Sequence, residues 1–158
     1  MRKYIPHVLI ISFIFLLAPT AQVASHAGEL EDAKEEVRKY PDEAWAHVNL
    51  GVAYRKLGKY KEAIESYKQA LRINPDYAYA HNNLGNAYCK LGYYKKAIES
   101  YKQVIRIDPD DVDAHFNLGL TYIILKDRGS ALKQHKILKK LDTEMAKKLL
   151  GMIYTELD

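Results

Sequence analysis

The stretch AHNNLGNAYCKLG, residues 80–92, places three asparagines, a histidine and the only cysteine of the chain within thirteen residues. A similar stretch occurs twice more, as AHVNLGVAYRKLG over residues 46–58 and as AHFNLGLTYIILK over residues 114–126. The stretch is therefore one copy of an internal repeat, so each of its residues has to be interpreted by its position in that repeat.

A Leu-Gly pair recurs every 34 residues and sets the register of the repeat. In each copy a tyrosine follows four residues after the leucine, and an alanine follows thirteen residues after it. A proline closes the first two copies. The pairs are Leu50-Gly51, Leu84-Gly85 and Leu118-Gly119, the tyrosines are Tyr54, Tyr88 and Tyr122, the alanines are Ala63, Ala97 and Ala131, and the prolines are Pro75 and Pro109.

This pattern resembles the tetratricopeptide repeat (TPR), which is specific when several units follow in tandem. Apolar residues within each unit recur at steps of three and four, which predicts two amphipathic helices per unit. Gly58 and Gly92 suit the turn between those helices, whereas Lys126 takes that position in the third unit. The resemblance implies an all-α fold, a right-handed α-solenoid of helix-turn-helix units.

The junctions between units predict where each helix begins. A proline ends the second helix of a unit, and the aspartate that follows it can cap the next helix. This assigns capping to Asp42, Asp76 or Asp110. The predicted organisation is a signal peptide over 1–27, an N-terminal half-repeat helix over 28–41, TPR units over 44–77, 78–111 and 112–145, and a C-terminal capping helix over 146–158.

The N-terminal segment predicts export. Arg2 and Lys3 precede an apolar run, Val8 to Leu17, and a small-residue stretch that ends at Ala27, which is typical of a secretory signal peptide. The run is short of the roughly 20 apolar residues that span a bilayer. We therefore predict a secreted protein of the bacterial periplasm or cell envelope, with an uncleaved membrane anchor as the alternative.

Composition is ordinary for a globular protein, with 48% hydrophobic and 28% charged residues among 158. Removal of residues 1–27 lowers the formal charge from +4 to +2, so we predict no nucleic-acid partner. The remaining charge is uneven: residues 28–50 hold seven acids and three bases, and residues 126–148 hold eight bases and three acids. This polarity suits self-association or an acidic partner, and a solvated lysine-rich helix face is the alternative.

The family resemblance implies that the first helices line a concave groove, with unit positions 2, 5, 6, 9, 12 and 13 facing it. Position 6 is an asparagine in all three units: Asn49, Asn83 and Asn117. An amide both donates and accepts, so a row of amides can satisfy the backbone of an extended peptide. The arrangement looks like the asparagine ladder in the repeats of O-linked N-acetylglucosamine transferase. Alternatively, these amides bond helix backbones or neighbouring repeats.

Other groove positions predict a peptide site with apolar ends and a polar middle, as peptide recognition requires. The lysines and asparagines of a two-carboxylate clamp are absent, because valines, Phe116 and Leu120 occupy the matching positions. Packing of Phe116 and Ile123 on the capping helix is an open alternative. The predicted peptide-binding residues are Asn49, Asn83, Asn117, Asn82, Asn86, Trp45, Val48, Val52, Tyr79, Phe116, Leu120 and Ile123.

No residue set predicts catalysis, a metal site or a cofactor. His47, His81 and His115 recur with the repeat, so they lie about 10 Å apart, whereas metal ligands must converge. Cys89 lacks an activating partner nearby in sequence. We therefore predict an adaptor or scaffold, not an enzyme, that binds a peptide or a partner helix. The alternative is a structural, self-associating module of a larger envelope assembly.

Overall fold

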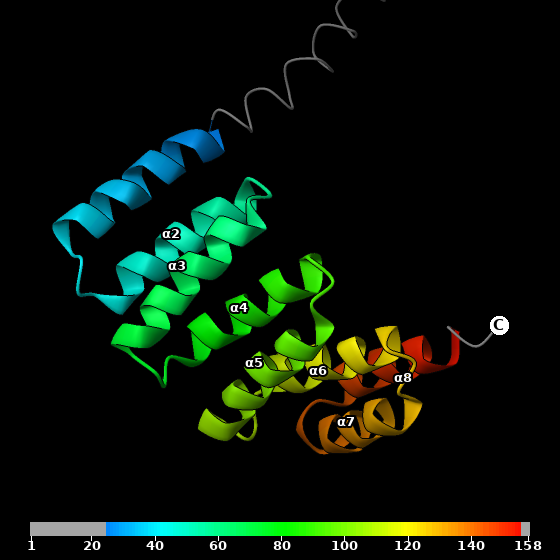
Figure 1. Ribbon diagram of the computed structural model, residues 1–158. Helices are drawn as coiled ribbons and strands as arrows, with labels where there is room; N and C mark the ends of the chain where they lie inside the picture. The colour runs from blue at the N-terminus through cyan, green and yellow to red at the C-terminus, as the bar shows by residue number, and fades with distance from the viewer. Residues whose placement is uncertain (1–24, 156–158) are drawn as a thin grey trace, which may run out of the picture.

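The structure is a computed structural model that describes residues 25–155, and the regular secondary structure in this range is helical throughout (Figure 1). This confirms the predicted all-α class. Residues 25–39 form the first helix. The helices that follow are α2 (Ala44–Lys56), α3 (Tyr60–Ile73), α4 (Ala78–Lys90), α5 (Tyr94–Ile107), α6 (Val112–Ile124), α7 (Arg128–Leu141) and α8 (Thr143–Thr155).

Most of the predicted signal peptide lies outside the described residues, which include only its last part, residues 25–27. Across residues 25–155, none of the helices has the length and apolar character needed to cross a membrane.

Each unit is a hairpin of two helices. In the first two units, a glycine of the first helix packs against a tyrosine of the second. A Cβ atom on Gly51 would lie 2.4 Å from Cε1 of Tyr67, and one on Gly85 would lie 2.6 Å from Cε1 of Tyr101. Both tyrosine rings are buried in the core. Because these glycines lack a side chain, α2 packs directly on α3, and α4 packs directly on α5.

The hairpins stack into a curved helical solenoid (Figure 1). The first helices of neighbouring units touch, since α2 contacts α4 and α4 contacts α6. The second helices, α3, α5 and α7, make no comparable contacts with one another in the described part of the chain. The stack therefore bends toward the first helices, and α2, α4 and α6 line its concave face.

The helix over residues 25–39 covers the first unit. Its Leu30 and Ala33 are buried against Ala53 of α2. An ion pair between Glu29 and Lys56 also joins the two helices. The exposed end of α2 is thus covered by an apolar stripe, as the ends of stacked repeats require.

The predicted capping by Asp42, Asp76 or Asp110 is wrong. The residues at the N-cap positions of α2 and α4 are Glu43 and Tyr77, and neither side chain makes a capping hydrogen bond. The aspartates lie one step earlier, inside the inter-unit turn. For example, the backbone N–H of Asp76 donates to Asn74 Oδ1 at 3.2 Å.

Side-chain caps occur instead in the C-terminal half of the chain. Asp111 caps α6 and Asp127 caps α7. Asp142 Oδ1 accepts a hydrogen bond from the backbone N–H of Met145 at 2.9 Å. This cap explains why α8 begins at Thr143, earlier than the capping helix predicted over 146–158.

Candidate functional site

The three position-6 asparagines use their amides in three different ways. Asn49 is exposed, and its Nδ2 donates to Glu36 Oε2 of the first helix at 2.9 Å. Asn83 is only 5% exposed, and its Nδ2 donates to the backbone oxygen of Tyr79 in the same helix at 2.9 Å. Both acceptors belong to this chain. Peptide binding by these two amides stays a prediction.

Asn117 joins two units. Its Nδ2 donates to Asn82 Oδ1 of the preceding unit at 3.3 Å. Its backbone oxygen accepts from Thr121 Oγ1 at 2.8 Å. Asn117 is therefore the position-6 amide that bridges α4 and α6 on the concave face.

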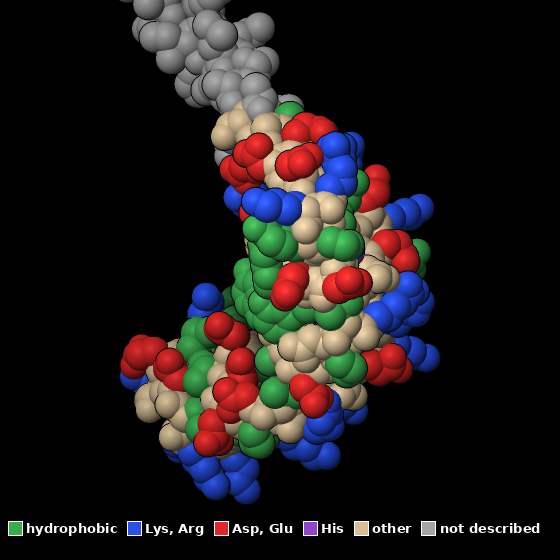
Figure 2. Space-filling model, turned by 90° about the vertical axis from the view of Figure 1, so that its left-hand side faces the viewer, with side chains coloured by type: hydrophobic (Ala, Val, Ile, Leu, Met, Phe, Trp, Pro, Cys, Tyr) green, Lys and Arg blue, Asp and Glu red, His purple; other side chains and the backbone are tan. Residues whose placement is uncertain are grey.

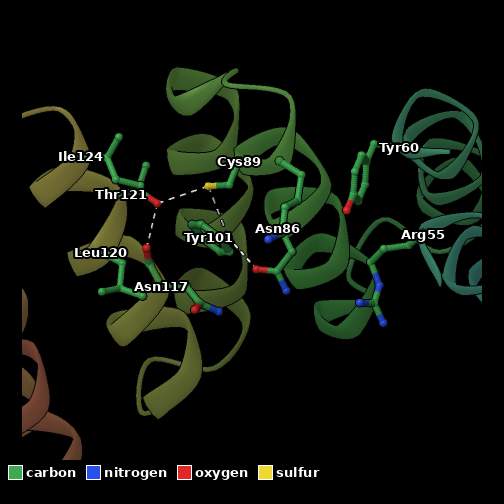
Figure 3. Close-up of a pocket in the computed structure, with 10 residues that line it drawn as sticks. Arg55, Tyr60, Asn86, Cys89, Tyr101, Asn117, Leu120, Thr121 and Ile124 are labelled. Atoms are coloured by element: carbon green, nitrogen blue, oxygen red, sulfur yellow. Dashed lines mark hydrogen bonds between the residues drawn. The ribbon is translucent and has the colours of Figure 1, made fainter. Parts of the chain in front are cut away.

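A pocket of about 360 Å³ lies on this face and spans the three units (Figure 3). It includes Asn86, Asn117 and Leu120 from the predicted set. It also includes residues outside that set, among them charged ones from α2 and α4. The residues that line it are Arg55, Tyr60, Asn86, Cys89, Lys90, Tyr101, Asn117, Leu120, Thr121 and Ile124.

The floor of the pocket is a hydrogen-bonded chain centred on a buried tyrosine. The Tyr101 hydroxyl donates to Asn86 Oδ1 at 2.7 Å and lies 3.7 Å from Cys89 Sγ. Cys89 Sγ in turn lies 3.5 Å from Thr121 Oγ1. Burial raises the pKa of Tyr101 well above its ordinary value, so this hydroxyl stays a neutral donor and fixes the Asn86 amide.

The first unit has a different arrangement at the equivalent place. Burial raises the pKa of Tyr67 to about 12, and the neighbouring Arg55 opposes that rise. Arg55 lies close enough to Tyr67 to lower the pKa of its hydroxyl, but neither Tyr67 Oη nor Arg55 Nε has a hydrogen-bond partner at normal distance among the described residues. Arg55 thus reaches from the buried hydroxyl of Tyr67 to the lining of the pocket.

The predicted apolar residues separate into exposed and buried groups. Trp45 and Tyr79 are exposed, and Trp45 packs on Tyr40 with ring centroids 5.3 Å apart. Val48 is buried in the core, with Val52 packed against the same cluster. Phe116 and Ile123 pack with α8 in the C-terminal core, which is the alternative left open for them. None of these residues lines the pocket.

The histidines that recur with the repeat each contact the backbone of the preceding inter-unit turn. In each unit the Nε2 atom lies within hydrogen-bond distance of the carbonyl oxygen of the proline six residues earlier, at 2.7 to 2.9 Å. The pairs are His47 with Pro41, His81 with Pro75 and His115 with Pro109. Within residues 25–155, no group of three or more His, Cys, Asp or Glu side chains is placed to hold a metal ion.

Comparison with known proteins identifies the fold family. A family model described as "TPR repeat" matches residues 51–92 and 85–123, and one described as "Tetratricopeptide repeat" matches residues 34–65. The crystal structure of MamA is similar, with a TM-score of 0.69 and 31% identity over 75% of this chain and 69% of that chain. The chain belongs to the tetratricopeptide repeat family.

Two further TPR structures are similar to this TPR chain. A thermophilic TPR protein of Thermus thermophilus has a TM-score of 0.67 and 27% identity, covering 78% of this chain and 71% of that chain. The first TPR of Spaghetti (RPAP3), bound to the HSP90 peptide SRMEEVD, has a TM-score of 0.68 and 23% identity, covering 73% of this chain and 93% of that chain. A search of curated proteins finds no match.

These findings confirm the family resemblance and the helical repeat solenoid that the sequence predicts. TPR proteins are generally protein-interaction modules without catalytic activity. The concave face of this chain is therefore the face to consider for a partner.

Proposed function

We propose that this TPR protein is an exported adaptor or scaffold whose concave face binds an extended peptide segment or a helix of a partner protein. The observation that carries the proposal is the pocket of about 360 Å³ shared by α2, α4 and α6. The peptide complex of the similar Spaghetti TPR supports the binding of a peptide by this fold. Export rests on the signal-peptide pattern of residues 1–27.

The pocket offers the two kinds of contact that an extended peptide needs. Amides of Asn86 and Asn117 can bond its backbone, and Leu120 and Ile124 provide apolar surface for a side chain. Ile124 is 51% exposed, so its surface is available for burial by a partner.

Exposed aromatic residues extend the surface beyond the pocket. Tyr40, Trp45 and Tyr79 are exposed near the start of α2 and α4. Figure 2 views the molecule from the side where these helices begin, and it shows a patch of hydrophobic side chains with both acidic and basic side chains beside it. A partner longer than the pocket would bury this surface as well.

The test is a selection from a displayed library of random peptides against the full-length protein. Selected peptides are then measured against Ile124→Ser and against the matched control Leu125→Ser. Both residues are exposed at the end of α6, but only Ile124 lines the pocket. We expect Ile124→Ser to weaken binding about tenfold, because an isoleucine contributes about 1.5–3 kcal/mol when buried.

Leu125→Ser should leave the affinity unchanged. Cys89, which also lines the pocket, gives a second measurement, because a bound peptide should slow its alkylation. Equal affinities for both variants, together with unprotected Cys89, would place peptide binding elsewhere and contradict the proposal.

A second candidate function is charge-driven self-association within an envelope assembly. The helix over residues 25–39 and the pair α7 and α8 lie at opposite ends of the stack (Figure 1). The exposed acids at one end include Glu31, Asp32 and Glu35, and the exposed bases at the other include Lys133, Lys136, Lys139, Lys140, Lys147 and Lys148. Light scattering at low and high salt tests this, since a monomer at every salt concentration excludes it.

A further inference from the structure

The charge of the pocket has one sign. Arg55 of α2 and Lys90 of α4 both line it, and none of its lining residues is an aspartate or a glutamate. Two cations with no carboxylate among the lining residues produce a positive potential in the pocket, which a concave, partly apolar site focuses. The pocket is thus suited to a negatively charged group.

Neither cation is neutralised within the described residues. The ion pairs found there do not include Arg55 or Lys90, although the adjacent Lys56 pairs with Glu29. Arg55 Nε is enclosed and has no hydrogen-bond partner in this part of the chain. A guanidinium that is partly removed from water and has no carboxylate partner is stabilised by an opposite charge, so an anion in the pocket beside Arg55 would be stabilised.

A neutral hydrogen-bond donor in the pocket also favours an anion. Because the Tyr101 hydroxyl holds Asn86 Oδ1, the Asn86 Nδ2 group is left as a donor. Figure 3 shows this nitrogen turned away from Tyr101, toward the side of the pocket where Arg55 lies. An amide N–H beside a guanidinium is a favourable setting for a carboxylate, because charge-assisted hydrogen bonds are the stronger ones.

We propose that the pocket recognises an aspartate or glutamate side chain within the bound segment, held by Arg55 and Lys90 with a hydrogen bond from Asn86. This inference rests on the proposed function and names the partner's chemistry: an extended peptide with an internal acidic residue. It differs from the two-carboxylate clamp, whose positions are occupied here by Val48, Val52, Phe116 and Leu120.

The experiment uses the same displayed library with the full-length protein. We expect the selected pool to be enriched in Asp and Glu relative to Lys and Arg. The tightest peptide is then synthesised with its acidic residue intact and changed to the neutral amide, both with a blocked C-terminus. We expect the amide peptide to bind wild-type protein about tenfold more weakly.

The double variant Arg55→Gln with Lys90→Gln should remove most of this difference between the two peptides. The matched control, Lys95→Gln with Lys102→Gln, changes the net charge equally at exposed positions of α5 outside the pocket, and the difference should persist. The single variant Lys90→Gln, at an exposed residue, serves if the double variant does not fold.

Equal binding of the acidic and amide peptides to the wild-type protein would overturn the inference. So would a requirement for a phosphorylated residue or for a free C-terminal carboxylate. If the acidic and amide peptides bind equally, and both lose affinity with Ile124→Ser but not with Leu125→Ser, the inference fails while the proposed function stands.

Discussion

The first two units and the third share one sequence frame but complete their cores differently. Gly51 and Gly85 each face a tyrosine of the same hairpin, whereas Gly119 faces Leu149 of α8. A Cβ atom on Gly119 would lie 2.6 Å from Leu149 Cδ2. The third unit therefore obtains from the capping helix the side chain that the others contain themselves.

His135 shows why the third unit needs this help. It occupies the repeat position of Tyr67 and Tyr101. Its Nδ1 lies 3.0 Å from the backbone oxygen of Ala146, so the ring contacts α8 through a hydrogen bond. α8 is therefore part of the third unit's core.

The largest effect is expected from Leu149→Ala. Leu149 is fully buried, and truncation of such a leucine costs about 2–5 kcal/mol in free energy of unfolding. Because repeats contact only their neighbours, hydrogen exchange should rise mainly in α6, α7 and α8. Urea unfolding measures the total loss, and exchange monitored by mass spectrometry locates it.

Leu150→Ala is the matched control, because Leu150 is the same residue type in the same helix but only partly buried, and its loss should be smaller. If Leu149→Ala increased hydrogen exchange as strongly in α2 and α3 as in α6, the substitution would destabilise the whole stack. The specific dependence of the third unit on α8 would then be contradicted.

The next effect compares Gly85→Ala with Gly119→Ala. The added methyl group at Gly85 meets ring atoms of the buried Tyr101, whereas at Gly119 it meets the methyl ends of Leu149. A flexible leucine end can rotate away and a packed ring cannot, so we expect a loss of about 2–3 kcal/mol at Gly85 and about 1 kcal/mol at Gly119. Thermal and urea unfolding measure both.

Gly151→Ala is the control for helix propensity, because a Cβ atom there meets nothing within 4 Å. It should stabilise α8 by up to about 1 kcal/mol. Equal losses for Gly85→Ala and Gly119→Ala would show that Leu149 is held as rigidly as the tyrosines.

The fold could be predicted from the sequence because the pattern that forms each helical hairpin lies within 34 residues and recurs in every unit. The 34-residue period and the apolar steps within each unit predict the helices, whereas the contact of Gly51 with Tyr67 and of Gly85 with Tyr101 is found only in the structure. The dependence on Leu149 could not be predicted in this way, since α8 lies outside the period. The contact of His135 with α8 likewise depends on tertiary packing and not on spacing.

The candidate site was less accessible to sequence reasoning. The family pattern assigns positions 12 and 13 to the groove, yet the predicted set omitted Arg55 and Lys90, which occupy those positions and line the pocket. Asn83 turns its amide to its own helix. The repeat period identifies the helix face on which a residue lies. The rotamer and the local hydrogen bonds decide whether its polar group is available to a partner.

Asp142→Ala is expected to lower the free energy of unfolding by less than Leu149→Ala or Gly85→Ala. The junction before α8 has a side-chain cap, whereas the junctions before α2 and α4 have none. Asp142 Oδ1 accepts from the backbone of α8, and loss of such a cap costs about 1 kcal/mol. Asp110→Ala is the control, since Asp110 lies in the preceding turn and caps no helix; α6 is capped by Asp111. An equal loss of stability in the two variants would contradict the capping assignment.

The smallest effect concerns the turn of the third unit. Lys126 has φ of 58°, close to the 71° of Gly58 and the 76° of Gly92, so the lysine adopts the left-handed conformation that glycine adopts in the other units. That conformation costs about 1–2 kcal/mol for a residue with a Cβ atom, and glycine loses more entropy on folding by about 0.5–1 kcal/mol. Lys126→Gly should therefore raise stability by about 0.5 kcal/mol, and Gly92→Lys should lower it by a similar amount, both measured by urea unfolding. A loss of stability in Lys126→Gly would mean that the long lysine side chain, and not the backbone conformation, determines the stability of this turn.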